Sequence, residues 1–498
     1  MEHENKICEG INEDELLVVR YFKEQQQHQN RFCGEIEAQH GAASNPTRLD
    51  LVAKVKPKPL VDVDDGLILI LARLPAKSLQ KFRCVCKSWN SLIQQDHHFI
   101  SLHQLHINHS NKKQPPSFVT LFATSRTPYY RGLESCVLNY SSSDTTTPYK
   151  MDFTRFLPEE DPLDFTNPSY FLTNSCNGLL GVYSCHSFFI INPSIRKLRP
   201  LPTTCAAPAW LAQAALGFDA STGVYKVVRI FDRERDVFVS VGFGCEVCYL
   251  GGGGSEGWKS INDPPVQPSY DSLPVVVDGA IIWASETIRG EAREVVALSF
   301  DLREEKFSVI LHPEVSSRPT VQPKSHVFVS EGHICVADEI PSPVPIPYMH
   351  IRHLNIWLLM KEEDQDKKKK NNSNKWVKQY VVDLTYVFEN FGPFLKAQPL
   401  TTDHNGRIVI YWGQGRILYY DPQTGSFDKH ELDATRVGGE EHVAPYTEGI
   451  VWPCPRLYGS AQRNREGSHP KALNWSILMC AINSTAFALH QQPLYCRV

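Results

Sequence analysis

The sequence lacks long apolar runs and a strong net charge. Its longest apolar stretches, such as LILILA at residues 67–72, are far shorter than the ~20 residues that span a bilayer. A formal charge of -4 offers no field that would attract nucleic acid or an anionic membrane surface. The first residues, MEHENKICEGINEDELL, have neither the basic start nor the apolar run of a secretory signal. We therefore expect a cytoplasmic or nuclear protein that binds neither nucleic acid nor a membrane.

Motifs that carry chemistry are also scarce. The 14 cysteines are scattered over 498 residues without the dense framework of a disulfide-stapled domain, so we expect reduced thiols. Cys245 and Cys248 form a lone C-x-x-C, and no cysteine or carboxylate completes a ligand set with the histidines around His103. The GGGG run at residues 251–254 lacks the pattern of a phosphate-binding loop. We expect no metal, no cofactor and no catalytic residue, and keep an enzyme built on the β-rich section as an alternative.

The composition and hydrophobic periodicity of the sequence change three times along the chain. Residues 1–60 contain the polar, proline-punctuated segments QQQHQN, GAASNP and KVKPKP, which predict a disordered extension. Helical periodicity runs from about residue 61 to 108, and short apolar runs separated by turn residues fill 115–453. Residues 454–498 follow neither pattern and stay unassigned. We therefore expect an α+β multidomain chain in which a small all-α domain precedes an all-β domain.

The β-rich section repeats one unit. A polar residue and a glycine precede an apolar run at Asn177, Asp278, Glu331 and Asn405, and turns such as DASTG and DPQTG follow. Five units are visible, each with material for about four strands, and a spacing of roughly 50 residues is typical of kelch-sized propeller blades. PPSFVTLFATS near Ser117 and EGIVWP near Val451 supply strands for a sixth blade or for ring closure. The expectation is a propeller-like domain of about five to six four-stranded blades, with an all-β sandwich as the alternative.

The helical section carries more apolar surface than it can bury. In LPAKSLQKFRCVCKSW, Leu79, Phe82, Val85 and Trp89 recur at three- and four-residue steps, and most basic residues fall on the other side. The preceding LILILARL is apolar around nearly its whole circumference. A unit this small has little interior, and each large side chain left in water forfeits ~1.5–3 kcal/mol relative to burial. A partner protein should cover the surplus face, unless the helices pack on the β section.

These residues resemble a known family. RLPAKSLQKFRCVCKSWNSLI closely resembles the F-box, and HHFISLHQLH resembles the end of plant-type F-boxes. FIINPSIRKLRPLP, LGFDASTGVYKVVRI and GWKSI resemble the kelch-like F-box-associated region of plant F-box proteins. The resemblance covers about residues 61–453. It departs from the family at Asp62, Val63 and Gly66, where the family has Leu-Pro and Leu-Leu around its acidic residues, and adaptor affinity is uncertain for that reason.

The resemblance implies a non-catalytic substrate receptor of an SCF-type cullin-RING ubiquitin ligase. The F-box would bind a Skp-type adaptor and, through it, the cullin and RING subunits. The β domain would bind a protein substrate of unknown identity for ubiquitination and degradation, and the RING subunit and conjugating enzyme would do the chemistry. An F-box protein that acts outside the ligase, or a diverged copy with little activity, is the alternative reading.

The resemblance and the loop pattern also name candidate residues. The adaptor-binding or F-box core residues carried over by position are Leu67, Ile70, Leu71, Leu74, Pro75, Leu79, Phe82, Val85, Cys86, Trp89, Leu92 and Ile93. For the substrate we expect the long connections 202–213, 230–244, 263–273 and 341–353, with the aromatic residues Trp210, Tyr270 and Tyr348.

Overall fold

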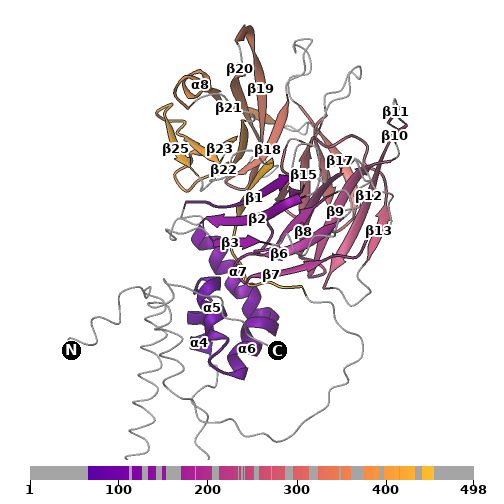
Figure 1. Cartoon of the computed structure of the whole chain (residues 1–498), viewed down its shortest axis with the longest axis vertical. Coiled ribbons are helices and arrows are strands. Elements are labelled where there is room, and N and C mark those ends of the chain that lie inside the picture. Colours follow the sequence, from indigo (N-terminus) through magenta and orange to yellow (C-terminus); the bar gives the residue numbers. More distant parts are fainter. Residues whose placement is uncertain are drawn as a thin grey trace, which may run out of the picture. The chain divides into compact units, whose positions relative to one another are not determined.

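The computed structural model describes residues 65–111, 115–125, 133–141, 149–152, 170–184, 187–204, 212–233, 235–236, 239–240, 242–251, 257–270, 272–285, 295–312, 324–346, 349–360, 375–391, 397–413, 415–431 and 440–453 (Figure 1). They fall into two compact units. The helical unit runs to His109 and takes in Glu448–Val451, and the β unit runs from Ser110 to Thr447 and resumes at Trp452. The predicted extension at 1–60 and the tail at 454–498 lie outside the described residues.

The helical unit contains α4 (Asp65–Leu71), α5 (Ala76–Phe82), α6 (Lys87–Gln95) and α7 (His97–Asn111). Short polar contacts begin the helices: Cys86 Sγ accepts the Trp89 N–H at 3.5 Å, and Asp96 Oδ1 accepts the Phe99 N–H at 2.9 Å. The rings of Phe82 and Trp89 pack edge to face at 5.7 Å between centroids. No helix in the described part of the chain is long and apolar enough to cross a membrane.

The described strands of the β unit form four four-stranded sheets, one eight-stranded sheet and one two-stranded hairpin. The eight-stranded sheet consists of two blades joined by a single parallel pair between Val329 of β18 and Thr401 of β22, so the unit has six four-stranded blades. Blades 1 to 3 are β1 (Ser117–Ser125), β2 (Leu133–Ser141) and β3 (Tyr149–Asp152) with β26 (Glu440–Tyr446); β4 (Phe171–Leu172), β5 (Leu180–Tyr183), β6 (Phe188–Asn192) and β7 (Lys197–Pro200); and β8 (Ala212–Asp219), β9 (Val224–Asp232), β12 (Phe243–Leu250) and β13 (Trp258–Ile261). Blades 4 to 6 are β14 (Val275–Val277), β15 (Ala280–Ala284), β16 (Val295–Asp301) and β17 (Lys306–Leu311); β18 (Ser325–Ser330), β19 (His333–Ile346), β20 (Met349–Leu359) and β21 (Trp376–Asp383); and β22 (Gln398–Thr402), β23 (Ile408–Gly413), β24 (Arg416–Tyr420) and β25 (Phe427–Glu431). β10 (Arg235–Asp236) and β11 (Val239–Ser240) form the hairpin, and the helix α8 (Thr385–Phe391) connects blades 5 and 6.

The ring closes through its last strand. β26 pairs antiparallel with β1, so that Ser117 lies opposite Tyr446. The innermost strands are β26, β4, β8, β14, β18 and β22, and β26 contacts both β4 and β22. The prediction of a propeller-like domain with a sixth blade near Ser117 is therefore confirmed. The predicted EGIVWP strand is wrong: the closing strand lies just upstream, where Val443, Ala444 and Tyr446 are buried, and residues 447–453 contain no strand.

The apolar core lies in layers between consecutive blades. One cluster joins Ala215 and Val228 of blade 3 to Trp283 and Phe300 of blade 4. Similar clusters join blades 1 and 2, 4 and 5, 5 and 6, and 6 and 1. A blade therefore buries its two faces only when both neighbours are present.

Turn chemistry explains the repeated glycines. Asn177–Gly178, Asp278–Gly279 and Glu331–Gly332 have positive φ at both positions, as type I′ hairpin turns require. These turns join the first strand of a blade to its second, and turns such as 301–305 join the third to the fourth. Antiparallel order puts both kinds at one end of the ring, which we call the tight-turn end. The connections between second and third strands, and between blades, lie at the opposite or loop end.

Candidate functional site

Burial separates the predicted adaptor residues into two groups. The buried group is Leu67, Leu71, Leu74, Leu79, Phe82, Trp89 and Ile93. The partly exposed group is Ile70, Pro75, Val85, Cys86 and Leu92. The first group forms the core of the helical unit, so a charge placed there would test folding. Only the second group remains available for a direct adaptor contact.

The residues carried over by position from the F-box resemblance did not include two exposed leucines. Leu69 in α4 is 47% exposed and Leu105 in α7 is 68% exposed. The signal for Leu69 was the all-round apolar run LILILA: since Leu67 and Leu71 lie on the buried face, the residues between them must point elsewhere. Gly66 belongs to the first turn of α4, where a glycine disturbs fewer helical hydrogen bonds than it would in the helix interior.

The strand directions bring the predicted substrate segments to one end of the ring. All four connections lie between strands that meet at the loop end. Two of them contain strand structure that was not predicted: 230–244 includes the β10–β11 hairpin, and most of 341–353 belongs to the long β19–β20 arm (Figure 1). Trp210 and Tyr348 lie outside the described residues. Tyr270 is half-buried, and its hydroxyl donates a hydrogen bond to Asp232 Oδ1 at 3.2 Å.

Two cavities lie among the innermost strands. A cavity of about 170 Å³ toward the tight-turn end is lined by Asn174, Val329 and Pro445 among others. A smaller cavity of about 30 Å³ toward the loop end, here called the loop-end cavity, is lined by residues of the inner strands β4, β8, β22 and β26, by the connection before β14, and by Tyr183 and Tyr411 of second strands. Leu273 and Pro274 line both cavities.

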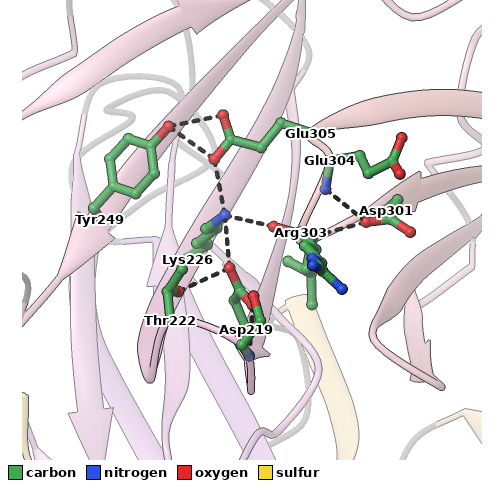
Figure 2. Close-up of polar contacts among 10 residues, drawn as sticks. Asp219, Thr222, Lys226, Tyr249, Asp301, Arg303, Glu304 and Glu305 are labelled. Atoms are coloured by element: carbon green, nitrogen blue, oxygen red, sulfur yellow. Dashed lines mark hydrogen bonds and ion pairs between the residues drawn. The ribbon is translucent and has the colours of Figure 1, made fainter.

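A buried lysine joins blades 3 and 4 at the tight-turn end. Lys226 Nζ lies 2.8 Å from Glu305 Oε1 and 3.2 Å from Asp219 Oδ2, and it also donates to the Leu302 carbonyl (Figure 2). Burial and the neighbouring Glu305 carboxylate raise the pKa of Tyr249, so its protonated hydroxyl donates to both Glu305 oxygens at 2.9 Å. The Lys226 ammonium contacts two carboxylates and one backbone carbonyl oxygen. We therefore infer that this cluster stabilises the contact between blades 3 and 4.

Glu305 occupies a position where related turns carry glycine. Its φ of 55° is left-handed, whereas Gly223 and Gly425 stand at this position in the turns that begin at Asp219 and Asp421. A non-glycine residue loses about 1–2 kcal/mol in this conformation. The bonds from Lys226 and Tyr249 to its carboxylate offset that cost.

The cluster predicts a pH dependence of stability. Burial opposes ionisation of Asp219, but hydrogen bonds from Ser221, Thr222 and Lys226 outweigh it and lower the pKa of this carboxyl below its ordinary value. A lowered folded-state pKa stabilises the fold above the unfolded pKa of about 4, and this contribution disappears as pH falls below it. We expect Asp219→Asn to lower the unfolding free energy at pH 7 by roughly 1–3 kcal/mol and to flatten its decline between pH 5 and 2.

The measurement is denaturant unfolding across that pH range. Asp421→Asn changes the similar DPQTG turn, which is solvent-exposed, and should have a smaller effect. Equal pH profiles for wild type and Asp219→Asn would contradict the assigned role of Asp219.

The cysteines and metal-ligand types show no reactive arrangement in the described ranges. Burial raises the pKa of Cys176 and Cys335 to about 12, which keeps both thiols protonated. Within those ranges, no group of three or more histidine, cysteine, aspartate or glutamate side chains could hold a metal ion.

Comparison with known proteins gives matches to both units. A family model described as F-box domain matches residues 64–101, and one described as F-box associated beta propeller domain matches residues 129–447. The Arabidopsis thaliana protein At4g09190, whose name places it among F-box proteins, is 26% identical over 387 residues, covering 73% of this chain and 84% of its own length. F-box/kelch-repeat protein At2g43445 of the same plant is 23% identical over 367 residues, covering 72% and 76% respectively. The match to F-box protein At1g30790, also from Arabidopsis thaliana and 26% identical, covers 50% of this chain and 61% of that protein.

Proposed function

The chain belongs to the F-box proteins that carry an F-box associated beta propeller domain, and on this premise we propose that it is the substrate-recognition subunit of an SCF-type cullin-RING ubiquitin ligase. The observation that carries the proposal is the pairing of a small helical unit that exposes leucines with a closed β ring that has one loop-rich end. The first unit suits a protein adaptor and the second suits a protein substrate.

The adaptor contact is assigned to the helical unit. Leu69 and Leu105 are exposed leucines, and Ile70, Val85 and Leu92 are partly exposed apolar residues of the same unit. Burying such side chains against a partner would gain up to ~1.5–3 kcal/mol each. The partner we propose is a Skp-type adaptor, which would bring the cullin and RING subunits. The protein would thus act in the cytoplasm or nucleus and would contribute no catalytic residue of its own.

The substrate contact is assigned to the loop end of the ring. Both termini of the ring, Ser117 and Tyr446, lie together at the tight-turn end, which leaves the connections of the loop end free to vary. Tyr270, and the predicted Trp210 and Tyr348, belong to connections of this end. We propose that these three aromatic side chains contact the substrate.

The test is adaptor capture with matched substitutions. We expect Leu69→Asp to weaken co-purification with a plant Skp-type adaptor by tenfold or more, because an unpaired carboxylate would have to be desolvated at the contact. Leu311→Asp is the matched control, since Leu311 on the outer strand β17 is similarly exposed, at 42%. Isothermal titration calorimetry would give the affinities.

Three outcomes would count against the proposal or a part of it. Folded wild-type protein that captures no adaptor would refute the receptor role. Adaptor binding that survives Leu69→Asp and Leu105→Asp together would refute the assigned face, and capture of adaptor without cullin and RING subunits would favour an F-box protein that works outside the ligase.

A further inference from the structure

The loop-end cavity combines aromatic walls with neutral polar groups. Its aromatic lining comes from three blades and the connection before β14: Phe171, Tyr183, Tyr270, Tyr411 and His442. The rings of Phe171 and His442 lie 4.9 Å apart, and those of Phe171 and Tyr183 lie 5.7 Å apart. No lysine, arginine, aspartate or glutamate is among its described lining residues.

Gln213, at the start of β8, presents a fixed acceptor to this cavity. The residue is 4% exposed, and its Nε2 donates to the Ser272 carbonyl at 2.9 Å and to the Ser269 carbonyl. Two carbonyl oxygens beside Nε2 determine which end of the amide is nitrogen, since an oxygen placed there would be repelled by both. Gln213 Oε1 is buried without a hydrogen-bond donor from the described residues.

Gln398, at the start of β22, adds a second amide to the same cavity. It is 3% exposed, and its Nε2 is buried with no acceptor among the described residues. Leaving a buried polar atom unpaired is costly, so an unpaired atom beside a cavity is a place where water or a bound group can form the hydrogen bond. The two residues that carry these atoms, from blades 3 and 6, line one small cavity, and one of the atoms requires a donor.

We propose that the loop-end cavity binds the carboxamide tip of an asparagine or glutamine side chain of the substrate. The inference rests on the proposed function and deepens it, because it names the chemistry that the ring would recognise. The substrate carboxamide donates its N–H to Gln213 Oε1 and accepts from Gln398 Nε2. A cavity of about 30 Å³ has room for about two water-sized groups, which matches the nitrogen and oxygen of one amide.

The lining disfavours charged tips of similar size. A carboxylate has no proton for Gln213 Oε1, and a lysine ammonium would find no carboxylate among the described lining residues. The hydroxyl proton of Tyr270 is directed to Asp232, so Tyr270 does not donate this proton to an anion in the cavity.

The experiment uses the full chain and observes small probes by saturation-transfer NMR. The probe is N-acetyl-glutamine methylamide, and the matched charged probe is N-acetyl-glutamate methylamide. We expect the glutamine compound to bind at least about tenfold more tightly, because the charged tip would be left unpaired in the cavity.

Variants connect the signal to the cavity. Gln398→Leu and Gln398→Met should each weaken binding of the glutamine probe about tenfold, and neither removes a hydrogen bond within the described chain. Gln423→Leu changes an exposed glutamine at the tight-turn end of the same blade and should leave probe binding unchanged. Melting temperatures would verify that each variant is folded.

The outcomes separate this inference from the proposed function. Equal binding of both probes, no binding of either, or binding that survives both Gln398 variants would overturn the carboxamide site and would mean that solvent alone satisfies the two amides. Adaptor capture is measured in the same samples, and its loss in wild type would refute the receptor role whether or not the probes bind.

Discussion

A chain that ends at Glu431, and so lacks β26, is expected to lose the folded β unit altogether. The truncation removes the buried side chains of Val443, Ala444 and Tyr446 and leaves the edge of β1 unpaired. It also opens the apolar layers between blades 1 and 2 and between blades 6 and 1. At ~1.5–3 kcal/mol for each large side chain, these losses are comparable with a typical stability of 5–15 kcal/mol. Solubility and thermal unfolding followed by circular dichroism are the measurements.

The control for this truncation ends at Pro453 and keeps β26. We expect it to remain soluble and to unfold cooperatively, whereas the shorter chain should aggregate through its exposed strand edges. A soluble, cooperatively unfolding chain that ends at Glu431 would show that the blades do not depend on ring closure.

Lys226→Met is expected to destabilise the β unit by about 3–5 kcal/mol. Methionine keeps the length and apolar stem of the lysine but leaves Asp219 and Glu305 facing each other's negative charge without a cation between them. Removing one partner of a buried ion pair typically has an effect of this size, because the remaining charges stay desolvated. The measurement is the free energy of unfolding at pH 7 from denaturant titration.

Lys306→Met provides the matched control. Lys306 pairs with Glu304 at 3.1 Å in the adjoining hairpin, but both side chains are largely exposed. Exposed pairs contribute about 0–1 kcal/mol, so this variant should unfold almost like wild type. Similar free energies for Lys226→Met and wild type would contradict the assignment of the buried cluster to inter-blade cohesion.

The sequence predicted those parts of the fold that depend on local chemistry. Gly178, Gly279 and Gly332 mark the turn of a blade because both central residues of a type I′ turn need positive φ, and this requirement is visible in any single repeat. The apolar periodicity around Leu79 likewise predicted a buried helical face. Spacing then predicted about five to six blades, because each repeat contributes one inner strand.

Local sequence patterns did not predict the features that depend on contacts between distant parts of the chain. EEHVAPY, the closing strand, is short and carries two charged residues, and only its pairing with Ser117–Ser125 across the whole ring identifies it. Gln213 and Gln398 each look like ordinary strand-entry residues, and their meeting at one cavity depends on how blades 3 and 6 face the middle of the ring. The exposed Leu69 could have been inferred from LILILA, since a helix that is apolar all round cannot bury every side.

The pairing of Ser117 with Tyr446 also determines the order of events during synthesis. The ribosome releases the helices of residues 65–111 first, whereas the edge of β1 waits for a partner strand that is translated last. Until then, the growing chain carries an unpaired edge that chaperones must shield. A message with a premature stop codon upstream of residue 440 would yield a product that keeps the helices of residues 65–111, lacks Glu448–Val451 of the helical unit, and has an open ring. Such a product is expected to aggregate while it still carries the helices that bind adaptor, and so to withdraw adaptor from the full-length protein.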